Sequence, residues 1–289
     1  MMGIERKKLL GQAGVAALVL GLAACSPAGE GEGEGEGAST RHAAQSAGHM
    51  DEGEGEGGSD GEGDEGGGAG GGEFGIDPDM ARADPVVYLT ALEVMRAHYL
   101  AGLAAFDEGR RAVGAEMFSH PISEIYVDLE PVIADLGAPD FYDSLLTASQ
   151  SPYDGSSDDA VRASVDTVLD AIDTAEQFTP QSEQSAAQVQ SRVIANMLER
   201  GALQYAFAQG SDSPNGPYLD GYGYYMSAQT IFDRHRDAIA DMEGGVAEAL
   251  GAALLAQSEA YATVTAPSPM SADSQRLISL ARAATDAVK

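Results

Sequence analysis

Cysteine is almost absent from this chain, whose 289 residues include a single one, Cys25. One cysteine cannot form a disulfide within the chain. A zinc site built from several cysteines is excluded for the same reason.

Basic residues are also scarce. The chain has 16 Lys and Arg against 46 Asp and Glu, which gives a formal net charge of -30 at pH 7. A surface of this sign repels nucleic acid phosphates and anionic headgroups, so we expect no nucleic acid partner. It favours cations or basic partners. Adaptation to a salty habitat would produce the same composition, and both interpretations stay open.

The patterns of common enzyme classes are missing. No glycine-rich phosphate loop stands between a strand pattern and a helix pattern, and no helix pattern carries two histidines in the zinc-protease spacing. No nucleophile with an adjacent base can be named. We therefore expect that the protein is not an enzyme.

The first residues have the pattern of a secretory signal. The charged residues Glu5 to Lys8 precede an apolar run from Leu9 to Leu22, which is too short to span a bilayer. Small residues follow at Ala23 and Ala24. We predict a signal peptide over residues 1–24.

The tetrad Leu22-Ala23-Ala24-Cys25 resembles the lipobox of bacterial lipoproteins. The resemblance implies that the signal is removed and that Cys25 is lipidated at the new N-terminus, leaving no thiol for chemistry. Several acyl chains on one residue hold a protein on a membrane without a second signal. In that family an Asp after the Cys retains the protein at the inner membrane. Ser26 stands there instead, which implies the outer membrane, with the domain facing the periplasm.

Residues 25–79 have the composition of a linker. Gly and Glu alternate from Gly29 to Gly37 and again from Glu52 to Gly58, so little apolar surface is available to offset the entropy of ordering. We predict a disordered acidic tether between the lipid and a folded domain. Loose binding of divalent cations by this segment is the alternative.

Residues 80–289 predict an all-α fold, a mostly antiparallel bundle of about seven to eight helices. Asp84 followed by Pro85 indicates a helix start, and apolar residues then recur every three or four positions to residue 107. His120-Pro121 is expected to begin another helix that ends at Gly137. Ser157 predicts a further start. Thr179-Pro180 is expected to open a long helix to residue 209.

The candidate metal ligands are Glu116, His120 and Glu124, which are spaced four residues apart, and His98, which borders the apolar stripe of its helix. Imidazole beside carboxylates suits Fe, Zn, Cu or Mn, and bundle cores hold such sites. A histidine before a proline can also simply cap a helix, with Glu124 complementing the helix dipole. Both interpretations stay open at this stage.

The densest aromatic segment contains Tyr218, Tyr222, Tyr224 and Tyr225. Three of them, Tyr218, Tyr222 and Tyr225, are predicted to form a surface that binds a partner protein. Ordinary packing explains the same residues, because tyrosine is partly apolar and partly polar. His235 is flanked by charged residues and is expected on a solvated face.

The segment His120-Pro121-Ile122-Ser123-Glu124 loosely resembles the Gly-x-His-x-x-Glu signature of imelysin-type proteins, which are linked to bacterial iron uptake. The resemblance implies iron or copper handling through His120 and Glu124. The sequence therefore predicts a lipid-anchored binding protein of the cell envelope that captures iron or copper and delivers it to a metal importer. The alternative is an adaptor lipoprotein that docks an envelope protein through the tyrosine surface.

Overall fold

The computed structural model describes residues 77–289. The predicted signal peptide, Cys25 and the predicted linker up to residue 76 lie outside the described residues. Expectations for those segments therefore stay predictions.

The predicted all-α class is confirmed, since residues 77–289 contain helices and no strand. The helices, in chain order, are α1 (Pro78–Ala83), α2 (Pro85–Asp107), α3 (Arg111–Pro121), the π-helix η1 (Ile122–Tyr126), α4 (Val127–Leu136), α5 (Tyr142–Gln150), α6 (Asp158–Glu176), α7 (Ala186–Gly210), α8 (Asn215–Ala240), α9 (Val246–Ala260) and α10 (Ser274–Ala287). The short α1 begins two residues before the predicted start of the domain at residue 80, so Pro78 and Asp79 are helical and do not belong to the predicted linker. Among these helices, none has the length and apolar character that a membrane crossing requires.

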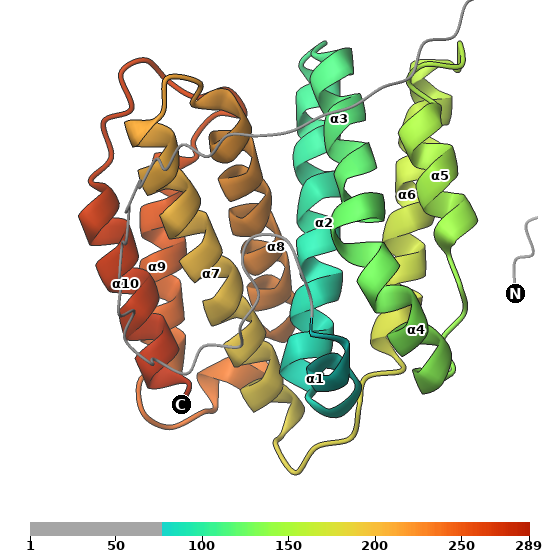
Figure 1. The fold of residues 1–289 in the computed structure, drawn as a ribbon. Coiled ribbons are helices and arrows are strands. Elements are labelled where there is room, and N and C mark those ends of the chain that lie inside the picture. Colours follow the sequence, from blue (N-terminus) through green and yellow to red (C-terminus); the bar gives the residue numbers. More distant parts are fainter. Residues whose placement is uncertain (1–76) are drawn as a thin grey trace, which may run out of the picture. The chain divides into compact units, whose positions relative to one another are not determined.

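Helix α2 is the centre of the arrangement. It contacts α3 and α6 in the first half of the fold and α7 and α8 in the second half. Figure 1 shows α3 to α6 on one side of α2 and α7 to α10 on the other. Because α2 is surrounded in this way, even its polar residues Glu93, Arg96 and His98 are buried.

The pairing of α2 with α8 is antiparallel. Glu93 contacts Ser227, Ala97 faces Gly223, and His98 lies near Asp220, so positions that rise along α2 fall along α8. This seam joins the two halves of the fold, and it carries the polar residues described below.

Several helix ends lie where the sequence predicts them. The Asp84 side chain accepts a hydrogen bond from Val86 N at the start of α2, and Ser157 accepts one from Ala160 N at the start of α6. Gly137 ends α4 with a φ of 78°, in the left-handed region that glycine adopts without strain. These signals are local, which is why the sequence reveals them.

The predicted start of α7 at Thr179-Pro180 is wrong. The helix begins at Ala186, where Ser185 and Gln188 form a reciprocal capping box. That box satisfies two backbone N–H groups at once, whereas the threonine and proline lie in the connection that follows α6.

Candidate functional site

Four side chains from four helical segments meet beside α2. They are His98 of α2, His120 of α3, Glu124 of η1 and Asp220 of α8. His98 Nε2 lies 3.8 Å from Glu124 Oε2 and 4.0 Å from Asp220 Oδ1, and His120 Nδ1 lies 3.9 Å from Glu124 Oε1. Ligand atoms of His98, His120 and Asp220 lie within 4.8 Å of one another. We call these four residues the histidine–carboxylate cluster.

His98 has its ring orientation set by the backbone of its own helix. Its Nδ1 lies 2.8 Å from the carbonyl oxygen of Val94, and because a carbonyl can only accept, Nδ1 must carry the hydrogen. Burial lowers the pKa of His98 to about 4, with a smaller contribution from His120. The ring is therefore neutral at pH 7, and its Nε2 presents a lone pair to the cluster.

The ring edges of His98 are also held by aromatic neighbours. The rings of His98 and His120 meet edge to face with centroids 5.8 Å apart, and Tyr224 meets His98 in the same manner at 6.3 Å. Tyr224 lies one turn after Asp220 on α8. The imidazole of His98 is thus fixed in orientation before any ligand arrives.

His120 and Glu124 lie where the helix is distorted. The sequence predicts that His120-Pro121 starts a new helix, and this is wrong, because the helical backbone continues from α3 through Pro121 into η1 and α4. Proline lacks an N–H and its ring collides with the carbonyl four residues earlier, so the regular pattern cannot continue. The residues after it adopt a π-helix, a feature often found at functional sites. Glu124 lies in this π-helix, and its Oε1 is 3.9 Å from His120 Nδ1.

Close approach of α3 to α2 brings His120 toward His98. A Cβ on Gly102 of α2 would lie 2.6 Å from the ring of Phe118 and 2.9 Å from Cβ of Met117, and a Cβ on Gly114 of α3 would lie 2.7 Å from the carbonyl oxygen of Gly102. Larger residues at these positions would push the helices apart. The two glycines therefore set the distance between the histidine-bearing helices.

Asp220 is the member of the cluster that sequence reasoning missed. It reaches His98 because Gly223 lets α8 lie against α2: a Cβ there would lie 2.9 Å from the carbonyl carbon of Ala97, with the carbonyl oxygen closer still. The only local signal is an acidic residue between Leu219 and Gly221, which are both buried. That signal does not say which distant side chain Asp220 meets.

Three of the candidate ligands, His98, His120 and Glu124, lie close together. Glu116 has a different position. It is exposed on α3, and the short contacts within residues 77–289 join the other three candidates to Asp220 and leave Glu116 out. The cluster therefore consists of two imidazoles and two carboxylates from four segments.

Tyr218 does not belong to the predicted partner surface. Tyr218 is fully buried, and its hydroxyl donates to the carbonyl oxygen of Thr263 at 2.8 Å. It packs against Tyr205 and Tyr261, with ring centroids 6.2 and 5.1 Å away. Tyr222 and Tyr225 are half-buried against the core. For Tyr218, packing in the core is thus the better interpretation, because its side chain is not exposed.

A second group of charged residues lies further along the α2–α8 seam. Arg96 donates to both carboxylate oxygens of Glu93 at 3.1 Å, to Asp173 at 2.7 Å and to Glu176 at 2.5 Å, and Ser227 donates to Glu93 at 2.6 Å. Burial raises the pKa of Glu93, and Arg96 opposes this rise. Each of these carboxylates has the same guanidinium as a partner, so this group is a structural joint between α2, α6 and α8.

His235 takes no part in the histidine–carboxylate cluster. It is half-exposed on α8, and burial followed by the neighbouring charge of Arg234 lowers its pKa. The expectation of a charged, partly solvated face is confirmed. His235 therefore provides a natural control for experiments on the cluster histidines.

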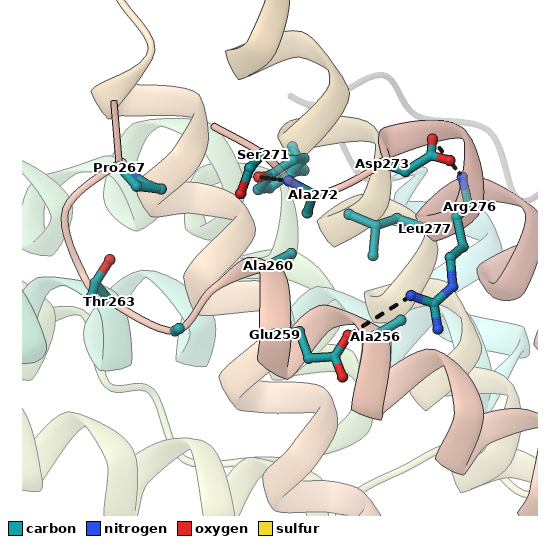
Figure 2. A pocket seen from close by; sticks show the side chains of 12 residues that line it. Ala256, Glu259, Ala260, Thr263, Pro267, Ser271, Ala272, Asp273, Arg276 and Leu277 are labelled. Atoms are coloured by element: carbon teal, nitrogen blue, oxygen red, sulfur yellow. Dashed lines mark hydrogen bonds and ion pairs between the residues drawn. The ribbon is translucent and has the colours of Figure 1, made fainter. Parts of the chain in front are cut away.

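A cavity of about 420 Å³ lies between α9 and α10, away from the cluster residues. Figure 2 shows small side chains around it, including Ala256, Ala260 and Ala272, and the ion pair between Arg276 and Glu259 at 3.8 Å. Both charged side chains of that pair are largely exposed. None of the candidate metal ligands lines this cavity, so the candidate site is the histidine–carboxylate cluster.

No family model matches the chain, and neither a characterised protein nor a solved structure is significantly similar to it. The resemblances to lipoproteins and to imelysin-type proteins therefore stay hypotheses.

Proposed function

We propose that this protein is a lipid-anchored, non-enzymatic binding protein of the cell envelope that captures a transition-metal cation. One observation carries the proposal: the lone pair of His98 Nε2 faces carboxylate oxygens of Glu124 and Asp220 at 3.8 and 4.0 Å. Ionised carboxylates accept hydrogen bonds and cannot donate one to Nε2. A cation between these electron-rich atoms turns their repulsion into attraction.

The spacing of the donors fits a single ion. Two donors about 2.1 Å from one ion at a tetrahedral angle lie roughly 3.4 Å apart. The three shortest separations, 3.8 to 4.0 Å, exceed this value by about half an ångström, and the ligand atoms of His98, His120 and Asp220 lie within 4.8 Å of one another. Small rotations of the more exposed ligands would close the gap, since the side chains of Glu124, Asp220 and His120 are 23, 24 and 33% exposed.

His98 has the hydrogen-bonding pattern of a metal ligand. Metal-bound histidines almost always donate their other ring N–H to a carboxylate or a backbone carbonyl, which fixes the tautomer and orients the ring. Val94 supplies that carbonyl at 2.8 Å. Exposure of the other three ligands leaves one side of the cluster accessible to solvent, as a capture site requires.

The proposed location rests on the N-terminal sequence. A lipid on Cys25 would anchor the chain in the outer membrane, and residues 25–79 would let the helical domain work in the periplasm. Iron or copper is the proposed cargo, and a metal importer of the envelope is the proposed partner. Two imidazoles and two carboxylates are a donor set that both metals accept.

Metal analysis of the full-length chain tests this function. The protein should be purified in detergent without a polyhistidine tag, stripped with a chelator and reloaded with Fe, Cu, Zn or Mn. We expect one ion per chain and a rise in thermal midpoint, because a ligand that binds only the folded state stabilises it. An absence of retained metal in the wild-type chain would refute the proposed function.

Matched variants show where the ion binds. His120→Gln removes a ligand that is one-third exposed, so the variant should fold and lose most of the bound metal. His235→Gln removes a histidine of α8 outside the cluster and should retain the metal of the wild-type chain. Equal metal loss in both variants would place the ion elsewhere.

A further inference from the structure

The charge of the histidine–carboxylate cluster indicates which cations it accepts. Glu124 and Asp220 each bring one negative charge when ionised, while His98 brings none, because a ring that binds an ion through Nε2 and donates its Nδ1 hydrogen to Val94 is neutral. Around one ion the two carboxylates therefore supply two negative charges. A doubly charged cation makes the assembled site neutral.

Neutrality matters because the cluster lies at the α2–α8 seam. Its central ligand, His98, is 5% exposed. Uncompensated charge is costly on the side of the cluster formed by this buried ring, although the two carboxylates are about a quarter exposed. A monovalent ion would leave one negative charge in the seam, so the site discriminates by charge as well as by ligand type.

Ligand type excludes two further groups of cation. Cuprous ions prefer the soft sulfur atoms of Cys and Met, and the cluster offers nitrogen and oxygen. Calcium and magnesium prefer all-oxygen surroundings, and half of the cluster's donors are imidazole nitrogens. Divalent ions of the first transition series accept both kinds of donor.

From this charge and donor set we infer that the cargo is a divalent transition-metal ion, such as Fe(II), Zn(II) or Cu(II), and neither Cu(I) nor an alkaline-earth ion. This inference rests on the proposed function and narrows it. For iron and copper it specifies the oxidation state in which the ion is captured. Asp220 has a defined part in the selection, since it supplies the second negative charge.

Competition titrations at pH 7 test the inference with the full-length chain in detergent. The probes are Zn(II), anaerobic Fe(II), Cu(I) held by a cuprous chelator, and Ca(II). We expect Zn(II) and Fe(II) to bind one site at least about tenfold more tightly than Cu(I), and Ca(II) to bind more weakly still.

The variant Asp220→Asn keeps the size of the side chain and removes its charge. Zn(II) affinity should fall at least about tenfold, a loss seen even for indirect partners of a metal, and the loss for Cu(I) should be smaller. Asp237→Asn makes the same chemical change at an exposed position of α8 and should leave both affinities unchanged.

The outcomes separate this inference from the proposed function. Failure of the wild-type chain to bind any of the ions would overturn both. Binding of Cu(I) or Ca(II) as tightly as Zn(II) would overturn only the inferred class of cargo. An equal loss of Zn(II) and Cu(I) affinity in Asp220→Asn would overturn the role of its charge.

Discussion

Replacing Gly223 by alanine should weaken both the fold and the proposed metal site. The new Cβ would lie 2.9 Å from the carbonyl carbon of Ala97 and 3.1 Å from Cβ of Ala101. Carbon atoms pack at roughly 3.5 to 4.0 Å, so α8 would have to move away from α2 by at least about half an ångström. The obstacle is backbone, which cannot rotate aside as a flexible side chain can.

The expected cost can be worked out from two opposing terms. Overpacking a tight contact costs about 1 to 3 kcal/mol, and a clash with backbone belongs at the upper end of that range. Alanine regains up to about 1 kcal/mol of helix propensity over glycine. The free energy of unfolding should therefore fall by about 2 kcal/mol. Asp220 moves with α8, so Zn(II) affinity should fall as well.

Gly216→Ala is the matched control, because it lies on the same helix and a Cβ there meets nothing within 4 Å. It should leave Zn(II) affinity unchanged and stabilise the fold by up to about 1 kcal/mol. Urea unfolding of the metal-free chain gives the stability, and competition with a chelator gives the affinity. If Gly223→Ala matches the wild-type chain in both measurements, close approach of α2 and α8 does not position the site.

Two further predictions concern buried charge. Burial lowers the pKa of His98 from 6.5 to about 4. As the pH falls, the unfolded chain therefore binds a proton at this histidine at a higher pH than the folded chain does. The free energy of unfolding of the metal-free chain should therefore fall by about 3 kcal/mol between pH 6.5 and pH 4, as measured by urea unfolding. A His98→Gln variant that keeps the same dependence on pH would contradict this prediction. Arg96→Met leaves Glu93 buried without its cation and should cost about 3 to 5 kcal/mol at pH 8. Arg234→Met alters a more exposed pair and should cost less than about 1 kcal/mol; similar thermal midpoints for both variants would refute the distinction.

Helix α2 carries two polar groups close together, the ion pair of Glu93 with Arg96 and His98 of the histidine–carboxylate cluster. Glu93 and Arg96 tie α2 to α6 and α8, and His98 lies less than one turn beyond Arg96. The register that satisfies the first group therefore also places His98 opposite Asp220. A helix surrounded by other helices can carry such residues only where partners meet them.

The helices themselves are largely predictable from the sequence because their signals are local. Asp84 before Pro85, Ser157 and Gly137 each act on backbone groups within one turn. The errors arise where two local signals compete. Near α7, the threonine and proline resemble a helix start, but the capping box at Ser185 satisfies more backbone donors and determines the boundary.

The positions of the tyrosines in the fold could not be predicted from composition. A row of aromatic residues is compatible with a surface or with a core, and sequence pattern alone does not separate the two. Tyr218 lies in the core because α9 and the connection behind it supply a carbonyl oxygen for its hydroxyl and rings for its face. Those partners come from another part of the chain.

What the sequence by itself determined is the all-α class, most helix boundaries and three of the four cluster residues, because periodicity, caps and the i,i+4 spacing of His120 and Glu124 are local properties. The tertiary structure alone decided that Asp220 completes the cluster, that Glu116 stays outside it, and that His98 presents Nε2 to two carboxylates. The physical reason is that these contacts depend on how closely separate helices approach. That distance is set by glycines whose role becomes visible only when the opposite helix is in place.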